Sequence, residues 1–288
     1  MKNRIILCGY IFLDFLARIV PYPAAYIVAY VLAKLAVFFN FCFDDLKRNV
    51  SIVLGFDMDS PEVIRHASNI YRNWLLNVVD FLKSPIVSKE KLAQRVKLEG
   101  LENLEDALKY KKGVVLFTAH IGNFEWGAAR LAVAGYDIWG TSLVRGYSKL
   151  DRFFEKRRKL KGLNTLYINK MLAVFRLLKK NAIVALPTDW DPMGKAKPID
   201  FFDRRARIPR GSIELALKSG APLIASFIYR DRKYTHHQVL TPVIELERDG
   251  DFDRLVEINT GKMVKVLEKY ITKHIDHWEL FHDIWEKQ

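Results

Sequence analysis

The sequence predicts an α/β fold in which a mixed, mostly parallel sheet is flanked by helices and follows an N-terminal membrane-binding helical region. From about residue 95, short β-rich runs alternate with amphipathic helical segments, a pattern typical of α/β proteins. Residues 5–43 are instead almost continuously apolar. The chain has 288 residues, of which 50% are hydrophobic, and this suffices for the core of one large domain.

The N-terminal segment, residues 5–43, carries few charges. From Ala24 to Phe43 the only charged residue is Lys34. A bilayer-spanning helix needs about 20 apolar residues, so this segment is borderline for a span. Asp14 and Arg18 interrupt the first apolar run, which argues against a cleaved signal peptide. We expect an uncleaved anchor that is either a helix pair lying in one leaflet or a single span. A buried helical hairpin is the alternative.

The remaining elements follow from periodicity and from turn residues. Gly55 is expected to end a first helix, and Ser60 and Pro61 fit the first positions of the next. No linker rich in Gly, Ser or Pro interrupts the chain, so the simplest partition is an anchoring segment at 1–44 and one catalytic-type domain at 45–288. Helices are expected at 44–55, 60–84, 101–112, 123–135, 147–162, 170–181, 211–220 and 252–274, and strands at 95–100, 113–119, 136–144, 164–168, 182–188, 222–230 and 236–247.

The net charge of +13 favours an acidic partner such as nucleic acid, an anionic membrane, an acidic protein or a phosphorylated substrate. Residues 145–161 alone hold eight basic and two acidic side chains. They are suited to a phosphorylated glycolipid, an acidic carrier protein or the bilayer surface, or they form a solvated helix face. No nucleic-acid-binding module is recognisable, and the apolar N-terminus argues against that class. The two cysteines, Cys8 and Cys42, have no zinc-type spacing.

The segment Val114 to Ala129, VVLFTAHIGNFEWGAA, is the strongest candidate for a functional site. A buried strand ends here in small and polar residues. Gly122 permits an unusual backbone angle, Asn123 is a favoured helix N-cap, and Glu125 falls in the first helical turn. His120 follows the strand end, where open α/β sheets bind ligands, and we expect it to meet Glu125.

A histidine held by a carboxylate is the orienting part of a nucleophilic triad. No Ser or Cys stands nearby, and the hydroxyl of Thr118 is expected to face the sheet. The nucleophile would then be a hydroxyl of the substrate, which His120 deprotonates. Spacing alone is weak evidence, because His274 and Glu279 share it in a tail that lacks a strand and a glycine turn. The alternative is a capped helix beside a surface histidine.

The block TAHIGNFEWG resembles the His-x4-Asp/Glu motif of the lysophospholipid acyltransferase superfamily. Within this motif, the sequence Gly-Asn-aromatic-Glu is similar to that found in the late lipid A acyltransferase branch, the lauroyl/myristoyl transferases. LVRGYSKLDRFFEKRRKLKG resembles that branch's second block, with Arg145 followed by Arg158 four residues before Gly162.

The resemblance extends in order over most of residues 45–286. LPTDWDPMGKAKPIDFFDRRARIPRGSIELALKSGAPLIASF is similar to the third block, with Asp189 and Asp191 as its Asp-x-Asp. HWELFHDIW resembles the closing Trp-x3-His motif through Trp278 and His282. The chain departs from the family pattern at the Phe-Phe-Gly turn and in the tail. The residues that depart are Asp203, Asp283 and Ile284.

This resemblance implies acyl transfer from a thioester, on acyl carrier protein or coenzyme A, to a hydroxyl of a lipid acceptor. It implies no metal and no cofactor beyond that co-substrate. His120 would take the acceptor proton, and Glu125 would hold the imidazole. Arg145 or Arg158, together with backbone amides near Gly122 and Asn123, would stabilise the oxyanion or hold phosphate.

Two further groups are candidates for substrate binding. Asp189 and Asp191 stand two residues apart, which suits a metal, but no matching His or third carboxylate is nearby. We expect them to orient arginines or acceptor hydroxyls. A basic run after Phe202 ends at Arg210, which we take as a further substrate-binding residue.

The acceptor predicted from the resemblance is a lipid A precursor, which places the protein in lipopolysaccharide biosynthesis. The expected location is the cytoplasmic face of the cell inner membrane, since basic residues follow the anchor. Three alternatives stay open. The acceptor is another glycolipid, such as a mannosylated phosphoinositide, or a lysophospholipid; the protein is a non-catalytic membrane-surface protein that recruits an acidic partner; or it is a hydrolytic thioesterase.

Overall fold

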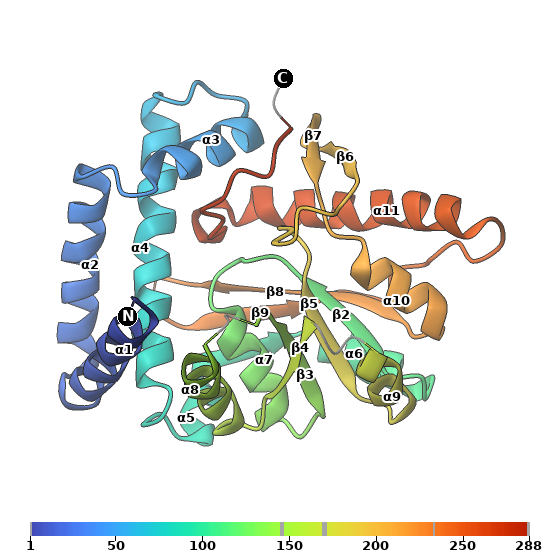
Figure 1. Cartoon of the computed structure of the whole chain (residues 1–288), viewed down its shortest axis with the longest axis horizontal. Coiled ribbons are helices and arrows are strands. Elements are labelled where there is room, and N and C mark those ends of the chain that lie inside the picture. Colours follow the sequence, from blue (N-terminus) through green and yellow to red (C-terminus); the bar gives the residue numbers. More distant parts are fainter. Residues whose placement is uncertain (1, 145–146, 169–171, 233, 287–288) are drawn as a thin grey trace.

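The computed structural model describes residues 2–144, 147–168, 172–232 and 234–286 (Figure 1). The helices are α1 Lys2–Ile19, α2 Tyr22–Phe38, α3 Phe43–Leu54, α4 Pro61–Lys83, α5 Lys89–Arg95, α6 Leu101–Lys109, α7 Phe124–Val133, α8 Ser148–Lys159, α9 Leu172–Lys179, α10 Gly211–Ser219 and α11 Phe252–Lys273, with a 3₁₀ turn at Ile275–His277. The strands are β1 Val96–Glu99, β2 Val114–Thr118, β3 Ile138–Ser142, β4 Asn164–Tyr167, β5 Ile183–Pro187, β6 Pro198–Phe201, β7 Arg204–Arg207, β8 Leu223–Arg230 and β9 His236–Leu240.

Among the described residues, seven of the strands form one sheet in the order β1-β9-β8-β2-β5-β3-β4, and β6 and β7 form a separate two-stranded sheet. The pairing of β8 with β9 is antiparallel and the other pairings in this sheet are parallel. The predicted α/β fold with a mixed, mostly parallel sheet and flanking helices is therefore confirmed. Residues that alternate along each central strand point into opposite layers, and both layers are apolar. Val115 and Phe117 of β2 pack in one cluster, and Val114 and Leu116 in the other.

The capping residues behave as their chemistry predicts. Gly55 ends α3 with φ +70°, a conformation that glycine adopts without strain. The Ser60 side chain accepts a hydrogen bond from the Val63 amide, with Pro61 at the first position of α4. Asn123 likewise caps α7 by accepting from the Trp126 amide at 3.0 Å.

Two segments differ from the prediction. The strand expected at 236–247 ends at Leu240, because Pro242 has no amide to continue the ladder. The antiparallel hairpin of β6 and β7 was not predicted. Its two-residue turn places Phe202 and Asp203 at φ 50° and 57°, as in a type I′ turn. Asp203, which departs from the resemblance, thus occupies a left-handed position that aspartate tolerates.

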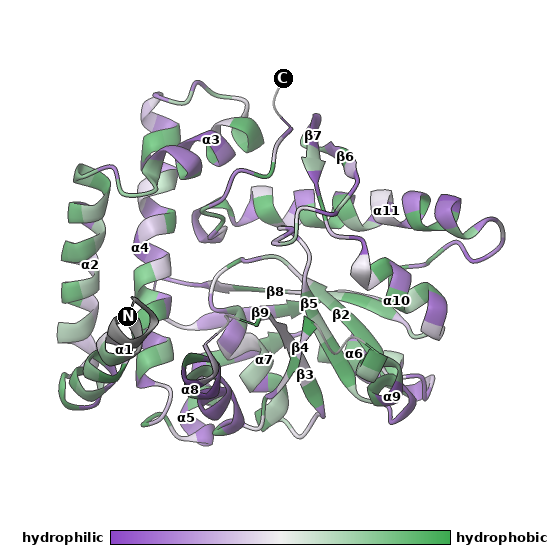
Figure 2. Cartoon of the chain, in the orientation of Figure 1, coloured by the Kyte–Doolittle hydropathy of each residue, from purple (hydrophilic) through white to green (hydrophobic). Residues whose placement is uncertain are grey.

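The N-terminal helices pack against α4 and leave much apolar surface uncovered. Figure 2 shows α2 predominantly in the hydrophobic colour. The alternative of a buried helical hairpin is therefore not supported by the described residues, whereas membrane binding by this region stays a prediction. In the described residues no single helix is long and apolar enough to cross a bilayer, and only α2 and α3 together, bent by 87°, meet that test. The strongly exposed apolar side chains of this region are Phe12, Phe15, Ile19, Ile27, Val28, Phe38, Phe39 and Phe41.

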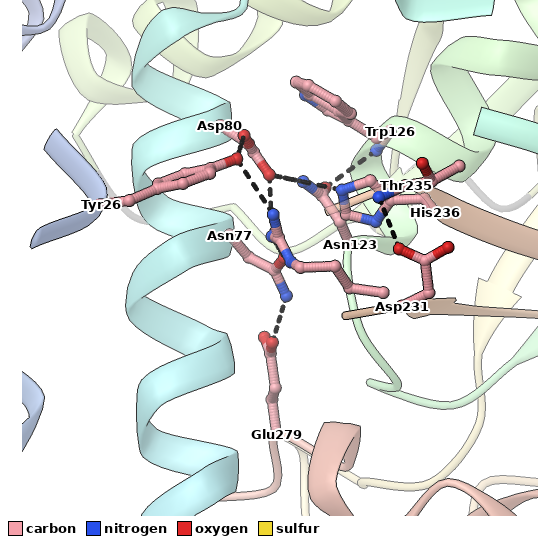
Figure 3. Close-up of polar contacts among 10 residues, drawn as sticks. Tyr26, Asn77, Asp80, Asn123, Trp126, Asp231, Thr235, His236 and Glu279 are labelled. Atoms are coloured by element: carbon pink, nitrogen blue, oxygen red, sulfur yellow. Dashed lines mark hydrogen bonds and ion pairs between the residues drawn. The ribbon is translucent and has the colours of Figure 1, made fainter. Parts of the chain in front are cut away.

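A buried ion pair joins α4 to the sheet (Figure 3). Asp80 is fully buried, and its Oδ2 accepts a hydrogen bond from Arg230, at the end of β8, at 2.8 Å. Its Oδ1 accepts from the Tyr26 hydroxyl of α2 at 2.7 Å, and His236 Nε2 lies 3.4 Å from Oδ2. Burial raises the pKa of Asp80, but the Arg230 guanidinium, the neighbouring His236 and the hydrogen bond from Tyr26 outweigh burial and lower it to about 2.

Replacing Asp80→Ala is therefore expected to reduce the free energy of unfolding by about 3–5 kcal/mol, because it leaves the Arg230 guanidinium buried without its counter-ion. Urea unfolding of the full-length protein in neutral detergent measures this. The matched control is Asp200→Ala, which breaks an ion pair with Arg205 in which both side chains are more than half exposed. Equal losses in the two variants would contradict the assignment of Asp80 as the link between α4 and the sheet.

Candidate active site

The site forms where the neighbouring strands β2 and β5 end. Thr118 pairs with Pro187 in the parallel register, so the residues two positions further on, His120 and Asp189, come side by side at the carboxyl edge of the sheet. His120 Nδ1 lies 2.7 Å from Asp189 Oδ1. The strand pairing thus brings together two side chains that are 69 residues apart in the chain.

Asp189 is fully buried and holds three groups. Its Oδ2 accepts hydrogen bonds from the His120 backbone amide at 2.9 Å and from the Trp278 indole at 2.9 Å, in addition to the ring contact at Oδ1. Burial disfavours a charge on His120, but the Asp189 carboxylate and its hydrogen bond outweigh burial and raise the pKa of His120 above 6.5. Burial also disfavours the charge on Asp189, which by itself raises the pKa of this carboxyl. The facing His120 outweighs burial, so the pKa of Asp189 lies below its ordinary value.

The second ring nitrogen of His120 is available for chemistry. Within the described residues Nε2 makes no hydrogen bond, and 24% of the side chain is exposed. Aromatic rings surround the imidazole: Phe124 stands edge-on at 5.1 Å, and Trp190 at 6.4 Å. His282 stacks on Trp190 at 4.2 Å. An Nδ1–H bonded to Asp189 leaves the Nε2 lone pair facing this aromatic opening.

The carboxylate that holds His120 is Asp189, and the expected contact with Glu125 is wrong. Glu125 is paired with Arg158 of α8, whose Nε donates to its Oε2 at 2.9 Å and whose NH2 donates to Oε1. A bidentate pair with a permanently charged guanidinium is stronger than a bond to a neutral imidazole, so Glu125 turns toward α8. It still adds a small electrostatic contribution that raises the pKa of His120.

The other pair with the same spacing does not meet either. Glu279 accepts a hydrogen bond from Asn77, and His274 stacks on Tyr229 at 4.1 Å. In both places the spacing of five residues did not predict a contact.

The backbone at Gly122 is held rather than free. Its φ is +57°, and an added Cβ would lie 2.3 Å from the Ile228 carbonyl oxygen, so only glycine fits. Its amide donates to the His277 carbonyl at 2.8 Å, and the Glu279 backbone amide donates to the His120 carbonyl at 2.7 Å. The Gly122 amide is thus not available for an oxyanion, contrary to expectation.

Two of the remaining candidates, Asp191 and Arg210, make no described contact with His120. Asp191 accepts from the backbone amides of Met193 at 3.0 Å and Ala196 at 2.5 Å, so it shapes its own loop. Arg210 occupies the N-cap position of α10 without a side-chain capping hydrogen bond, and no described contact joins its side chain to His120 or Asp189. Arg145 lies outside the described residues. Among those described, no cluster of three or more His, Cys, Asp or Glu side chains is placed to hold a metal ion.

A narrow apolar pocket of about 50 Å³ lies between α7 and the sheet. Phe124, whose ring lies 5.1 Å from the His120 ring, contributes to its lining together with Glu125 and Arg158. Aliphatic side chains of the central strands and of α7 supply most of the remaining wall, among them Leu116, Leu131, Ile138, Leu163 and Ile228.

The comparison with known families decides the class of the protein. A family model described as bacterial lipid A biosynthesis acyltransferase matches residues 2–287. The chain belongs to this family. It is accordingly an acyltransferase, and the resemblance drawn from the sequence blocks is confirmed.

Relatives of this acyltransferase carry a narrower description. The phosphatidylinositol mannoside acyltransferase of Mycobacterium tuberculosis (strain ATCC 25618 / H37Rv) is 24% identical over 254 residues, which cover 84% of this chain and 77% of the relative. The phosphatidylinositol mannoside acyltransferase of Mycolicibacterium smegmatis (strain ATCC 700084 / mc(2)155) is 27% identical over 192 residues, covering 62% and 60% respectively.

Several residues beside the candidate site, or in the buried polar contacts that connect its loop to α4, were not singled out from the sequence. Trp190 and Asn77 had no motif to mark them, and Asp80 and Arg230 lie far apart in the chain. Asp189 was a candidate for orienting arginines or acceptor hydroxyls, and the sequence also held a signal for its contact with His120. Asp189 follows the strand β5 at the same offset of two residues as His120 follows β2.

The pKa of His120 tests the pairing directly. In NMR titrations of histidine-labelled protein, we expect the His120 pKa above 6.5 in the parent and lower in Asp189→Asn, because the neutral amide no longer stabilises the imidazolium. Glu125→Gln should lower it less. His120→Gln assigns the signal. A larger drop in Glu125→Gln than in Asp189→Asn would contradict the site as described.

Proposed function

We propose that the protein transfers a fatty acyl chain from an acyl thioester to a hydroxyl of a phosphorylated glycolipid, with His120 as general base and Asp189 as the residue that holds it. The observation that carries the proposal is the orientation of the imidazole. Asp189 binds Nδ1 at 2.7 Å, which leaves Nε2 without a hydrogen bond to any described residue at a partly exposed position.

The reaction balances with these groups alone. The acceptor hydroxyl gives its proton to His120 Nε2 as its oxygen attacks the thioester carbonyl. The Asp189 carboxylate stabilises the imidazolium that forms. Collapse of the tetrahedral intermediate breaks the C–S bond, and the imidazolium returns the proton to the departing sulfur. The products are the ester and a free thiol, on acyl carrier protein or coenzyme A.

Glu125 acts in this proposal by holding Arg158. Only 11% of the Arg158 side chain is exposed, and the bidentate pair keeps the guanidinium beside the apolar pocket. A cation there attracts the negative charge that develops on the thioester oxygen. The same pocket, lined by aliphatic side chains, would receive the acyl chain once its walls part, since its present volume of about 50 Å³ is small.

Two acceptors follow from different observations. The family description favours a lipid A precursor, whereas both curated relatives are described as phosphatidylinositol mannoside acyltransferases, which favours a mannosylated phosphoinositide. Both acceptors are phosphorylated glycolipids, and the basic helix α8 suits either.

The exposed apolar side chains of α1 and α2 support a location at a membrane surface. We propose that they enter one leaflet of an anionic membrane, on the cytoplasmic face of the cell inner membrane. No metal is required by the proposed reaction.

To test this proposal, detergent-purified protein is incubated with a labelled long-chain acyl thioester and with each of the two glycolipids. The products are identified by mass spectrometry. We expect one added acyl group on at least one glycolipid and loss of that product in His120→Ala. Free fatty acid without acylated lipid would indicate a thioesterase. Transfer that persists unchanged in His120→Ala would contradict the role of the base, and no transfer from folded protein would leave the recruitment alternative.

A further inference from the structure

A second cleft, of about 1150 Å³, lies between α2, α4 and the turn that joins β8 to β9. Its lining contains none of His120, Glu125, Arg158 or Asp189. The segment at 276–279 separates it from the candidate active site. His277 lines the cleft, while its carbonyl accepts the Gly122 amide at 2.8 Å on the side of the catalytic loop. The cleft is therefore a separate feature of the fold.

The lining is rich in arginine. Two acidic side chains also line the cleft, but both are engaged: Asp276 by His66 at 2.6 Å, and Asp231 by His237 at 3.1 Å. Two of the guanidinium groups, Arg72 and Arg232, form no hydrogen bond or ion pair within the described residues. The cleft is therefore lined mainly by positive charge, which suits an anionic group. The arginines of the lining are Arg65, Arg72, Arg95, Arg230 and Arg232.

The floor of the cleft is rigid. Arg230 is fixed by the buried Asp80, which also binds the Tyr26 hydroxyl of α2 (Figure 3). Tyr26 stacks on Tyr234 at 5.1 Å, and the Arg95 guanidinium lies 4.1 Å from the centre of the Tyr22 ring. Arginine forks match the geometry of phosphate oxygens, and tyrosines are favoured where water meets hydrocarbon.

The rim of the cleft on α2 is apolar. Ile27 and Tyr30 line the cleft and are 65% and 44% exposed, and Val31 beside them is 49% exposed. A ligand that contacts both the arginine-rich lining and the apolar rim would carry an anionic group at one end and hydrocarbon at the other. Neither free phosphate nor a neutral lipid makes use of both features.

We propose that this cleft binds the phosphate of an anionic phospholipid, with Arg72 and Arg232 on the phosphate and the acyl chains along the exposed face of α2. This lipid is a bound component of the membrane surface and not the acceptor of the reaction. The inference rests on the membrane association included in the proposed function, and it concerns a site that the transfer reaction does not use.

The test measures binding without turnover. Full-length protein in neutral detergent is titrated by calorimetry with dihexanoyl phosphatidylglycerol, with dihexanoyl phosphatidylcholine and with inorganic phosphate. The test variant is Arg72→Gln combined with Arg232→Gln. The matched control, Arg204→Gln combined with Arg254→Gln, removes the same charge at exposed positions on β7 and α11.

We expect phosphatidylglycerol to bind more tightly than either other ligand, and the test variant to lose affinity by about tenfold or more. The control variant should bind as the parent does, and acyl transfer to a glycolipid in detergent should be unchanged in both. Equal losses in the two variants, equal binding of phosphatidylcholine or of inorganic phosphate, or no binding would each overturn the proposal. Because the readout is binding, failure of the transfer assay does not affect it.

Discussion

The buried carboxylate of Asp189 organises the centre of this protein. It binds the ring and the backbone amide of His120 and the indole of Trp278. A charge buried so completely is stable only when its hydrogen bonds are satisfied, and here three donors from the His120 loop and the C-terminal tail satisfy it. Loss of any donor loosens the others. The same carboxylate therefore sets the position of His120 and the place where the tail docks.

The tail transmits this constraint to the N-terminal helices. Residues 275–280 run beside the His120 loop and exchange backbone hydrogen bonds with it. Glu279 then accepts from Asn77 of α4, the same helix whose Asp80 binds Arg230 and Tyr26. Helix α2, which exposes apolar side chains, and the candidate catalytic base are thus joined through one continuous set of buried and part-buried polar contacts. If the protein binds a membrane as proposed, this arrangement would fix the position of His120 relative to the lipid surface that supplies the acceptor.

The sequence predicted the fold well because local periodicity determines helices and strands. It predicted the capping roles of Ser60 and Asn123 for the same reason, since a cap involves neighbours in the chain. It did not predict the partner of His120. That partner depends on β2 lying next to β5, and strand order is not written in local pattern.

The hairpin of β6 and β7 and the tail show the same limit. Phe202 and Asp203 lack the Asn-Gly signal of a tight turn, so the hairpin had no local mark. Trp278, Phe281 and Trp285 have a helix-like spacing, yet the chain there is largely irregular. The position of Trp278 is instead set by its hydrogen bond to Asp189, a contact that spans 89 residues.

The dependence of acyl transfer on pH, compared between Asp189→Asn and Glu125→Gln, tests the central claim most directly. A neutral imidazole is the active form, so kcat/KM should rise with pH through the raised pKa of His120. Asp189→Asn should lower kcat/KM by about 10²-fold or more and move this acid limb to lower pH. Glu125→Gln should leave the limb nearly in place. A full rate in Asp189→Asn, with the loss and the shift confined to Glu125→Gln, would contradict the account.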